Sequence, residues 1–417
     1  MDKGRRTGLR WHPSFLRLWA SQSISLLGSR VTMTALPLTA VYALHATAFE
    51  MGILTAAGPL AYLLVGLPAG AWVDRLPRRP VMIVADLGRA ILLASIPIAS
   101  IVGLLSMAQL FLVALLVGVL TVFFDVAYQS LLPSVVRADQ LVEANSKLRV
   151  SESVTQVAGP GVGGGLVQIL GAPVAIAADA VSFVLSALSL VLVRAREAAP
   201  SGQESRHLGR EIQTGVATVL RTPSLGALAG AGVTFNLFDN VLMAVYVLYM
   251  TRTLHFPSTL VGLVFGLGGI GGLVGATIAE RVTTRFGHRR VMLAGIAISA
   301  AGEFTIAGAR DPILVAVIIL LTAETMVEFG GTLYGIDAAS FCQATVPGSL
   351  QGRVTATMRV ISWGVGSLGA LAGGVLGGAI GVRPTVLIAG MGSLLSILWL
   401  VRGHAVDWQP STQVTHS

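Results

Sequence analysis

Lysine, cysteine and charge are all scarce in this chain. Its 417 residues include two lysines, Lys3 and Lys147, and one cysteine, Cys342, and charged residues make up only 12%. One cysteine excludes an intramolecular disulfide framework. No G-x-x-x-x-G-K-[ST] loop is present, so the sequence offers no ATP-binding loop of this kind. Soluble domains carry roughly 25% charged residues, so the composition also excludes an ordinary soluble protein.

Apolar residues and glycine are abundant instead. Hydrophobic residues make up 54%, glycines number 49, and the mean hydropathy is +0.78. A helix needs about 20 apolar residues to cross a bilayer. Twelve segments meet this need, so we predict an all-α polytopic membrane protein with helices at 15–43, 51–73, 81–104, 107–132, 148–170, 173–194, 223–250, 259–280, 291–309, 312–337, 354–380 and 384–402.

A single long polar connection divides these segments six and six. It predicts four regions: an N-terminal six-helix bundle at 1–194, a cytoplasmic linker at 195–221, a C-terminal bundle at 222–403 and a cytoplasmic tail at 404–417. The seven histidines show no pair at the spacing of metal ligands, so neither a metal nor another cofactor is expected.

The basic residues predict the orientation. Twenty-three of the 28 lie at the two termini and in the loops on the same side; the opposite loops hold only Arg252, Arg310 and Arg383, and Arg30 and Arg89 lie within helices. Because cytoplasmic loops are enriched in Lys and Arg, both termini should be cytoplasmic in a multi-pass protein of the inner membrane. This topology accounts for the net charge of +8, so no nucleic-acid partner is expected.

The two halves resemble each other. "KLRVSESV" from Lys147 is similar to "TMRVISWG" from Thr357, 210 residues later, and "RRPVMI" in the first half is similar to "HRRVML" in the second. Gly171 and Gly381 have the same spacing. We therefore predict two parallel six-helix repeats, as in secondary transporters.

A dense charge cluster lies between the second and third predicted helices. Gly70, Asp74, Arg75, Arg78 and Arg79 follow the spacing G-x-x-x-D-R-x-x-R-R. Topology alone favours basic residues in such a cytoplasmic loop.

The fifth helix carries a second motif, "GPGVGG", with Gly159, Pro160, Gly163 and Gly164. It also matches G-x-G-x-x-G, but a dinucleotide site requires a βαβ unit, which this sequence does not predict. Proline removes a backbone hydrogen bond and glycine permits close contact, so we interpret the motif as a kinked, closely packed helix.

Both motifs resemble signatures of the major facilitator superfamily: the loop motif is similar to its loop 2–3 signature, and "GPGVGG" resembles a helix 5 element of its antiporters. The segments "LWASQSISLLGSRVTMTALPL", "SLLPSVVRADQLVEAN" and "DAVSFVLSALSL" look like those of bacterial exporters related to enterobactin and macrolide efflux proteins. The resemblance implies the major facilitator fold. It also implies a cytoplasmic gate in which Arg78 contacts Asp125 in the outward-facing state, supported by Asp74.

Polar residues deep within predicted spans are costly and therefore informative. The candidates for proton coupling are Glu324, Glu328 and Asp239, and the candidates for the substrate cavity are Arg30, Asn236 and Asn240. The alternative is a buried salt bridge with Arg30 that only fixes helix packing.

Other charged residues have structural interpretations. Asp86 with Arg89, and Arg149 with Glu152, are spaced for i,i+3 pairs. Asp337 is expected at the cytoplasmic boundary. The remaining two acids within spans, at positions 179 and 303, receive no role.

The sequence predicts a secondary active transporter rather than an enzyme. We expect proton-coupled efflux of a hydrophobic or amphipathic small molecule, such as a drug, siderophore or secondary metabolite, by alternating access. The partners would be this small molecule, protons and the lipid bilayer, and the protein would be monomeric. The alternatives are an importer or uniporter on the same scaffold, or a non-transporting membrane scaffold or sensor.

Overall fold

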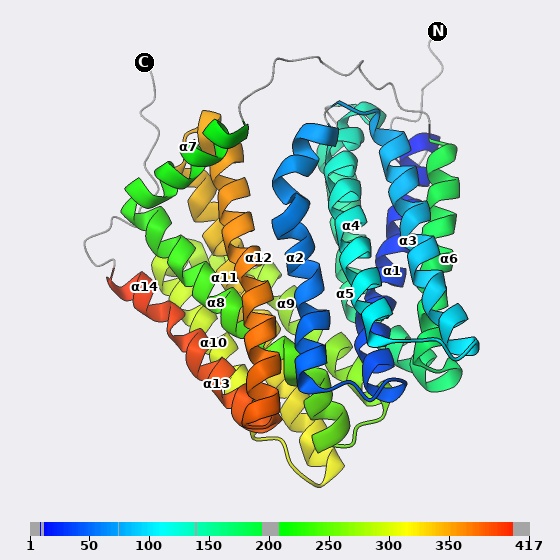
Figure 1. Cartoon of the computed structure of the whole chain (residues 1–417). Coiled ribbons are helices and arrows are strands. Elements are labelled where there is room, and N and C mark those ends of the chain that lie inside the picture. Colours follow the sequence, from blue (N-terminus) through cyan, green and yellow to red (C-terminus); the bar gives the residue numbers. More distant parts are fainter. Residues whose placement is uncertain (1–8, 10–11, 74, 138–139, 194–207, 403–417) are drawn as a thin grey trace, which may run out of the picture. The chain divides into compact units, whose positions relative to one another are not determined.

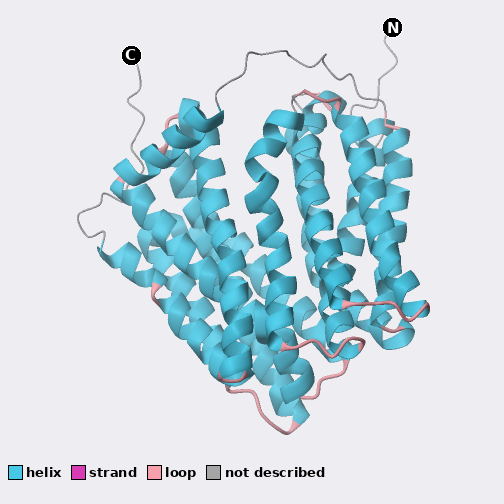
Figure 2. Ribbon diagram, viewed as in Figure 1, coloured by secondary structure: helices cyan, strands magenta, loops and turns pink. Residues whose placement is uncertain are grey.

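The computed structural model describes residue 9 and residues 12–73, 75–137, 140–193 and 208–402. Within these residues the regular elements are helices (Figures 1 and 2). They are α1 (Pro13–Tyr42), α2 (Ala48–Val73), α3 (Arg78–Ile101), α4 (Met107–Val135), α5 (Leu141–Leu170), α6 (Ala172–Val191), α7 (Leu208–Arg221), α8 (Pro223–Leu248), the π-helical turn η3 (Tyr249–Thr253), α9 (Ser258–Phe286), α10 (His288–Ala307), α11 (Ile313–Thr345), α12 (Gly348–Ala379), α13 (Val382–Leu394) and α14 (Ser396–Arg402).

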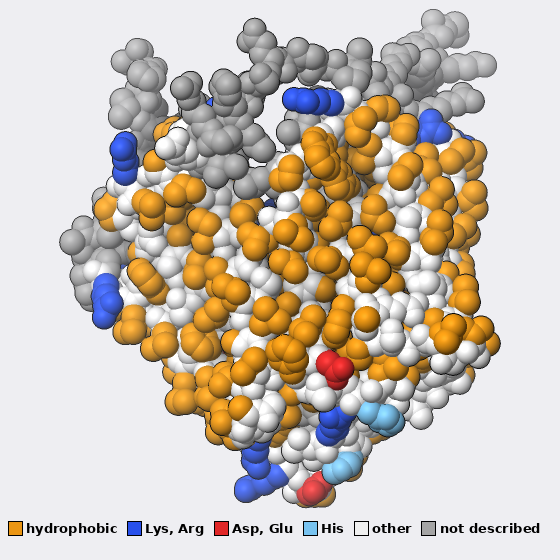
Figure 3. Space-filling view, viewed as in Figure 1, with side chains coloured by type: hydrophobic (Ala, Val, Ile, Leu, Met, Phe, Trp, Pro, Cys, Tyr) orange, Lys and Arg blue, Asp and Glu red, His pale blue; other side chains and the backbone are white. Residues whose placement is uncertain are grey.

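Eleven segments of the described chain are long and apolar enough to cross a membrane; α8 with η3 forms one of them, and α13 with α14 forms another. The helix α5 is not among them, because charged residues occupy its first half and glycines lower the hydropathy of its second half. Together with α5, these segments account for the twelve predicted spans. Hydrophobic side chains cover most of the face in Figure 3, and charged side chains lie mainly towards its ends.

Several helices continue past the predicted apolar segments. The helix α5 begins at Leu141 rather than at 148, α9 ends at Phe286 rather than at 280, and α11 ends at Thr345 rather than at 337. A hydropathy pattern locates only the apolar part of a helix, whereas backbone hydrogen bonding continues into its polar ends.

Local sequence determines several helix ends. Thr47 and Glu50 form a capping box at the start of α2: the Thr47 amide donates to Glu50 Oε2 at 2.8 Å, and the Glu50 amide donates to Thr47 Oγ1 at 3.3 Å. Gly171 and Gly381 join consecutive helices at φ values of 83° and 90°. Glycine adopts this left-handed region at no steric cost.

The chain forms two compact units, which are treated separately. The first comprises Met1–Ala46, Leu64–Gly202 and Pro257–Gly262, and the second comprises Thr47–Leu63, Gln203–Phe256 and Leu263–Ser417. In the first, α1 packs on α5 and α6, and α3 packs on α4 and α6. In the second, α8 packs on α12 and α13, and α10 packs on α11 and α13. The packing order is therefore the same in both units.

Individual contacts repeat with the predicted spacing. Arg79 Nε donates to the Leu190 carbonyl oxygen at 2.8 Å, and Arg289 Nε donates to the Leu400 carbonyl oxygen at 3.1 Å. Both residues of the second pair lie 210 positions after those of the first. In each unit the arginine thus binds a carbonyl at the end of the unit's last helix, where unpaired carbonyls favour a cation.

Glycine contacts explain why the compact units differ from a simple division into halves. An added Cβ at Gly52 of α2 would lie 2.8 Å from the Gly374 Cα of α12, and one at Gly262 of α9 would lie 2.9 Å from the Gly164 Cα of α5. These pairs are again related by 210 positions. The start of α2 therefore groups with the second unit, and the start of α9 groups with the first. The predicted bundle boundaries stay predictions.

The predicted linker contains a helix that the sequence analysis missed. The helix α7 packs on α12 and α8 in the second unit. Its Gly215 is buried, an added Cβ there would lie 2.9 Å from the Arg353 carbonyl oxygen, and Val219 is 2% exposed. Gly215 and Val219 are one turn apart, so α7 docks by one face.

Candidate functional site

The second unit brings the three proton-coupling candidates together. Asp239 lies in α8, and Glu324 and Glu328 lie one turn apart in α11. The Glu324 carboxyl interacts electrostatically with Glu328 and Asp239. Glu324 is 2% exposed, whereas Asp239 and Glu328 are half-buried. Of the three, Glu324 is thus the acid most completely removed from solvent.

A glycine face on α9 accommodates the acids of α11. An added Cβ at Gly268 would lie 2.1 Å from Glu324 Cγ, and one at Gly272 would lie 3.3 Å from Glu328 Oε2. Gly271 lies between these two glycines, and an added Cβ there would lie 2.1 Å from the Thr325 carbonyl oxygen. The run "GLGGIGG" in α9 therefore lets the two helices approach closely while the carboxylates remain between them.

Two further polar groups belong to this site, and sequence reasoning gave neither a role. Glu303 of α10 is fully buried, and both its carboxyl oxygens accept from Ser393 Oγ of α13, at 3.0 and 2.9 Å. Glu303 interacts electrostatically with Asp239 and Glu324. The other group is the Tyr246 hydroxyl of α8, which is also fully buried and lies next to Glu324.

Few charged or hydrogen-bonding partners surround the acids of this site among the described residues. Within the described chain, Asp239, Glu303 and Glu324 form no ion pair. Glu324 Oε2 and the Tyr246 hydroxyl have no hydrogen-bond partner of good geometry among the described residues. An ionised carboxylate without a partner is very costly in an apolar interior. The arrangement is therefore suited to a carboxyl group that carries a proton for part of a cycle.

The predicted cavity residues lie in different units. Asn236 and Asn240 of α8 donate to the carbonyl oxygens four residues earlier in their own helix, both at 2.9 Å. Arg30 of α1 belongs to the first unit, where its guanidinium lies 3.7 Å from Met33 Sδ and its Cβ lies against Gly159. The alternative of a salt bridge between Arg30 and the acids is not tested by these contacts within each unit.

In the first unit, the buried acid of α3 is paired with a base of the same helix. Asp86 pairs with Arg89 on α3, and Ser186 Oγ of α6 donates to Asp86 Oδ2 at 2.6 Å. The Arg89 guanidinium lies 4.4 and 4.1 Å from the ring centroids of Phe124 and Phe183. The predicted Asp86–Arg89 pair is confirmed.

Two other predictions about charged residues have different outcomes. Arg149 and Glu152 form the predicted i,i+3 pair at 2.9 Å. The boundary position predicted for Asp337 stays a prediction, and its side chain is buried, with 1% exposed. Asp337 Oδ1 accepts from Thr283 Oγ1 at 2.9 Å and lies 2.8 Å from His288 Nδ1. Packing against Thr283 and His288 buries this acid, and hydropathy alone does not reveal such packing.

The loop motif is only partly described. Gly70 lies in α2 with open space where a Cβ would be, Arg75 lies exposed in the turn, and Arg78 begins α3. Asp74 lies outside the described residues. Asp125 lies in α4 of the same unit, and its contact with Arg78 stays a prediction.

The helix 5 motif produces close packing. An added Cβ at Gly159 would lie 2.3 Å from Arg30 Cβ, and one at Gly163 would lie 3.1 Å from the Val31 Cα of α1. Gly164 faces α9, as described above. The helix α5 runs through Pro160 without interruption, so glycine contact is its main structural feature.

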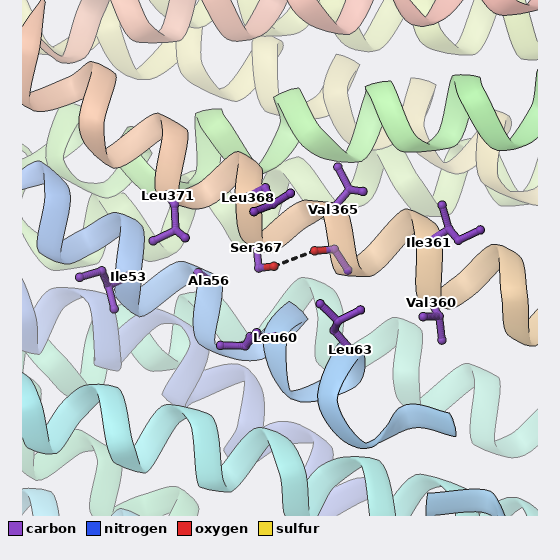
Figure 4. A pocket seen from close by; sticks show the side chains of 11 residues that line it. Ile53, Ala56, Leu60, Leu63, Val360, Ile361, Val365, Ser367, Leu368 and Leu371 are labelled. Carbon is purple, nitrogen blue, oxygen red and sulfur yellow. Dashed lines mark hydrogen bonds between the residues drawn. The ribbon is translucent and has the colours of Figure 1, made fainter. Parts of the chain in front are cut away.

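A pocket of about 620 Å³ opens in the second unit between the first half of α2 and the middle of α12 (Figure 4). Its walls are almost entirely aliphatic: Ile53, Ala56, Leu60, Leu63, Val360, Ile361, Gly364, Val365, Ser367, Leu368 and Leu371 line it. The Ser367 hydroxyl donates to the Gly364 carbonyl oxygen at 2.6 Å, so it offers no free proton to a ligand. The volume falls within the range of small-molecule sites.

Comparison with known proteins agrees with this architecture. The profile of the transmembrane secretion effector family, within the major facilitator superfamily, matches residues 9–415. The chain belongs to this family. It is 28% identical to the multidrug efflux pump Tap of Mycolicibacterium fortuitum over an alignment of 403 residues. This alignment covers 93% of this chain and 95% of Tap. It is 25% identical over 272 residues to macrolide efflux protein A of Streptococcus pyogenes, 63% of this chain and 66% of that protein.

A solved structure supports the fold. The nucleoside transporter NupG aligns with a TM-score of 0.76 at 12% identity, over 93% of this chain and 98% of NupG. This likeness confirms the predicted major facilitator fold. The protein is therefore a multi-pass membrane transporter of small molecules. In this family member, the acids of the second unit are the candidate site for coupling transport to an ion gradient.

Proposed function

We propose that this transporter exports hydrophobic or amphipathic small molecules in exchange for protons. It would lie in the cytoplasmic membrane with both termini inside, as its basic residues indicate. The names of Tap and macrolide efflux protein A support the direction and the drug-like substrate class. The aliphatic pocket supports an apolar substrate, because its walls offer almost no polar atom to a hydrophilic one.

One observation carries the proton proposal: Glu324 is 2% exposed, forms no ion pair in the described chain, and faces further acids. Such a group can bind and release a proton as its exposure to water changes, whereas a carboxylate held by an arginine cannot do so readily. Asp239 and Glu328 are half-buried and would connect Glu324 to water.

The energy available is sufficient for export. One proton moving through about 100 mV supplies about 2.3 kcal/mol. At about 1.4 kcal/mol per factor of ten, this supports a substrate gradient of roughly fortyfold. In the proposed cycle, the proton leaves on the cytoplasmic side as substrate binds, and substrate leaves on the outer side as a proton binds, with two bundles alternating access.

The test is transport by Glu324→Gln, Glu328→Gln and Asp239→Asn in inverted vesicles with an imposed pH gradient. Uptake of a radiolabelled macrolide and of a lipophilic dye is measured. We expect at least one variant, and Glu324→Gln first, to lose accumulation against the gradient, because Gln cannot exchange a proton. The matched control is Glu280→Gln, which changes an exposed acid of α9.

The other outcomes discriminate between alternatives. Wild-type accumulation by all three single variants and by the Glu324→Gln/Glu328→Gln double variant would contradict a role for this site in coupling. Transport that only equilibrates the substrate would favour a uniporter, and wild-type protein that moves neither probe would contradict export of these substrate classes.

A further inference from the structure

Tyr246 lies beside the buried carboxyl of Glu324 in an arrangement that packing alone does not explain. The tyrosine is fully buried in α8, yet its hydroxyl has no hydrogen-bond partner of good geometry among the described residues. Buried tyrosine hydroxyls usually find a partner. A phenylalanine would fill the same space without the cost of burying an unsatisfied hydroxyl.

The helix α9 places the two groups next to each other. The Tyr246 ring packs edge-on against Phe265, with ring centroids 5.4 Å apart. One turn further along α9, Gly268 leaves the space that the Glu324 side chain occupies. Tyr246 and Glu324 interact electrostatically, and Glu324 Oε2 also has no hydrogen-bond partner in the described chain. The structure therefore holds a donor beside an acceptor, and neither forms a hydrogen bond of good geometry with a described residue.

We propose that Tyr246 is a positioning residue that donates a hydrogen bond to Glu324 when this carboxyl loses its proton. This inference rests on the proposed proton coupling. A hydrogen bond from a neutral donor to a charged acceptor stabilises the charged form. Tyr246 thus lets Glu324 release its proton to a less alkaline cytoplasm than the buried acid alone would require.

The charged neighbours of Glu324 make such a donor necessary. Glu328 lies on the same helix, Asp239 approaches from α8 and Glu303 from α10. Negative charge on any of them opposes ionisation of Glu324. On α9 the neighbouring position is Gly268, which contributes no charge. Tyr246 is then the neighbouring group that favours the ionised carboxylate.

The experiment measures the protonation of Glu324 directly. Infrared difference spectra of the purified full-length protein are recorded against pH, and the carboxylic-acid band lost in Glu324→Gln identifies Glu324. We expect Tyr246→Phe to raise the midpoint of this band by about one to two pH units, the effect of removing one hydrogen bond to a charged group. The pH dependence of macrolide export should move upward in parallel.

The matched control is Tyr249→Phe, three residues later. The Tyr249 hydroxyl donates to the Ala309 carbonyl oxygen at 3.0 Å, so this variant should lose thermal stability and keep the wild-type midpoint. Tyr246→Phe should show the opposite pattern, because the Tyr246 hydroxyl forms no hydrogen bond of good geometry in the described chain. A midpoint in Tyr246→Phe that equals or falls below the wild-type value would overturn the inference.

The two proposals fail differently. If Glu324→Gln removes no titrating band, then Glu324 is not the proton-binding group and both the coupling site and the role of Tyr246 are wrong. If Glu324→Gln removes the band and transport fails, but Tyr246→Phe leaves the midpoint unchanged, then the coupling site stands and only the role of Tyr246 is wrong.

Discussion

Gly268 of α9 should control the placement of Glu324. In Gly268→Ala, the new Cβ would stand 2.1 Å from Glu324 Cγ and 2.7 Å from its Cβ. Non-bonded carbon atoms prefer at least about 3.5 Å, so the nearer contact is roughly 1.4 Å too short. Either α9 and α11 must separate or the Glu324 side chain must leave its rotamer. A change of rotamer displaces the carboxyl from Tyr246, and a separation of the helices opens its packing against α9.

The size of the effect follows from two opposing contributions. Overpacking a well-packed interior costs about 1–3 kcal/mol. Replacing a helical glycine with alanine gains about 0.5–1 kcal/mol. The matched control is Gly331→Ala on α11, where an added Cβ meets nothing within 4 Å. Because the helix gain applies to both variants, Gly268→Ala should be less stable than Gly331→Ala by the overpacking cost of about 1–3 kcal/mol.

The assay is equilibrium unfolding in mixed micelles, combined with export driven by a pH gradient. Gly268→Ala should lower both the unfolding free energy and the export rate, and Gly331→Ala should lower neither. A double-mutant cycle with Glu324→Gly isolates the contact, because that substitution removes the two side-chain atoms, Cβ at 2.7 Å and Cγ at 2.1 Å, that would lie closest to the new Cβ. A coupling energy within about 0.5 kcal/mol of zero would refute the reasoning, since independent sites are additive to that degree.

Two further predictions concern topology and the repeated arginine contacts. Cysteines introduced singly at Ser205 and Thr47, in a cysteine-free background, should react with an impermeant thiol reagent from opposite sides of the membrane; labelling from one side would contradict the twelve-span topology. Arg79→Lys and Arg289→Lys should each lower the unfolding free energy by about 1–2 kcal/mol, because each guanidinium binds two neighbouring carbonyls and lysine cannot span both. Arg290→Lys, at an exposed position, should have no effect, and equal values for all three variants would refute the shared role.

The sequence predicts those features that depend on local spacing or on repetition. Helical spans appear as apolar runs, and the i,i+3 pair of Asp86 and Arg89 follows from helix geometry. The repeat was visible as a 210-residue offset, and the contacts of Arg79 and Arg289 obey it. Recognising the apolar runs, the i,i+3 pair and the repeat requires no knowledge of which helices pack together.

Features that depend on helix packing were missed. Glu303 and Ser393 are 90 positions apart, and His288 and Asp337 are 49 apart, so no local pattern joins them. Tyr246 has no sequence signal beyond being a tyrosine in an apolar span. The amphipathic helix α7 did carry a signal, since apolar residues recur at helical spacing in "EIQTGVATVL", but its polar surroundings favoured a linker.

The relation between the repeats also indicates which polar residues the fold itself requires. Subtracting the 210-residue offset from Glu324 and Glu328 leads to Ala114 and Gly118 in α4, and subtracting it from Glu303 leads to Leu93 in α3. The first unit thus builds the same packing of α3 on α4 with no ionisable group at any of these positions.

The ion pair of the first unit likewise has no counterpart in the second unit. Asp86 and Arg89 correspond to Ile296 and Ser299, so the second unit packs α10 without that ion pair. A scaffold that forms equally well with alanine, glycine and leucine does not need acids at these positions for folding. Burying a carboxyl group that lacks an ion pair is costly. The acids at positions 303, 324 and 328 are therefore better explained by chemistry than by helix packing, and proton exchange is the chemistry that their burial and their neighbours support.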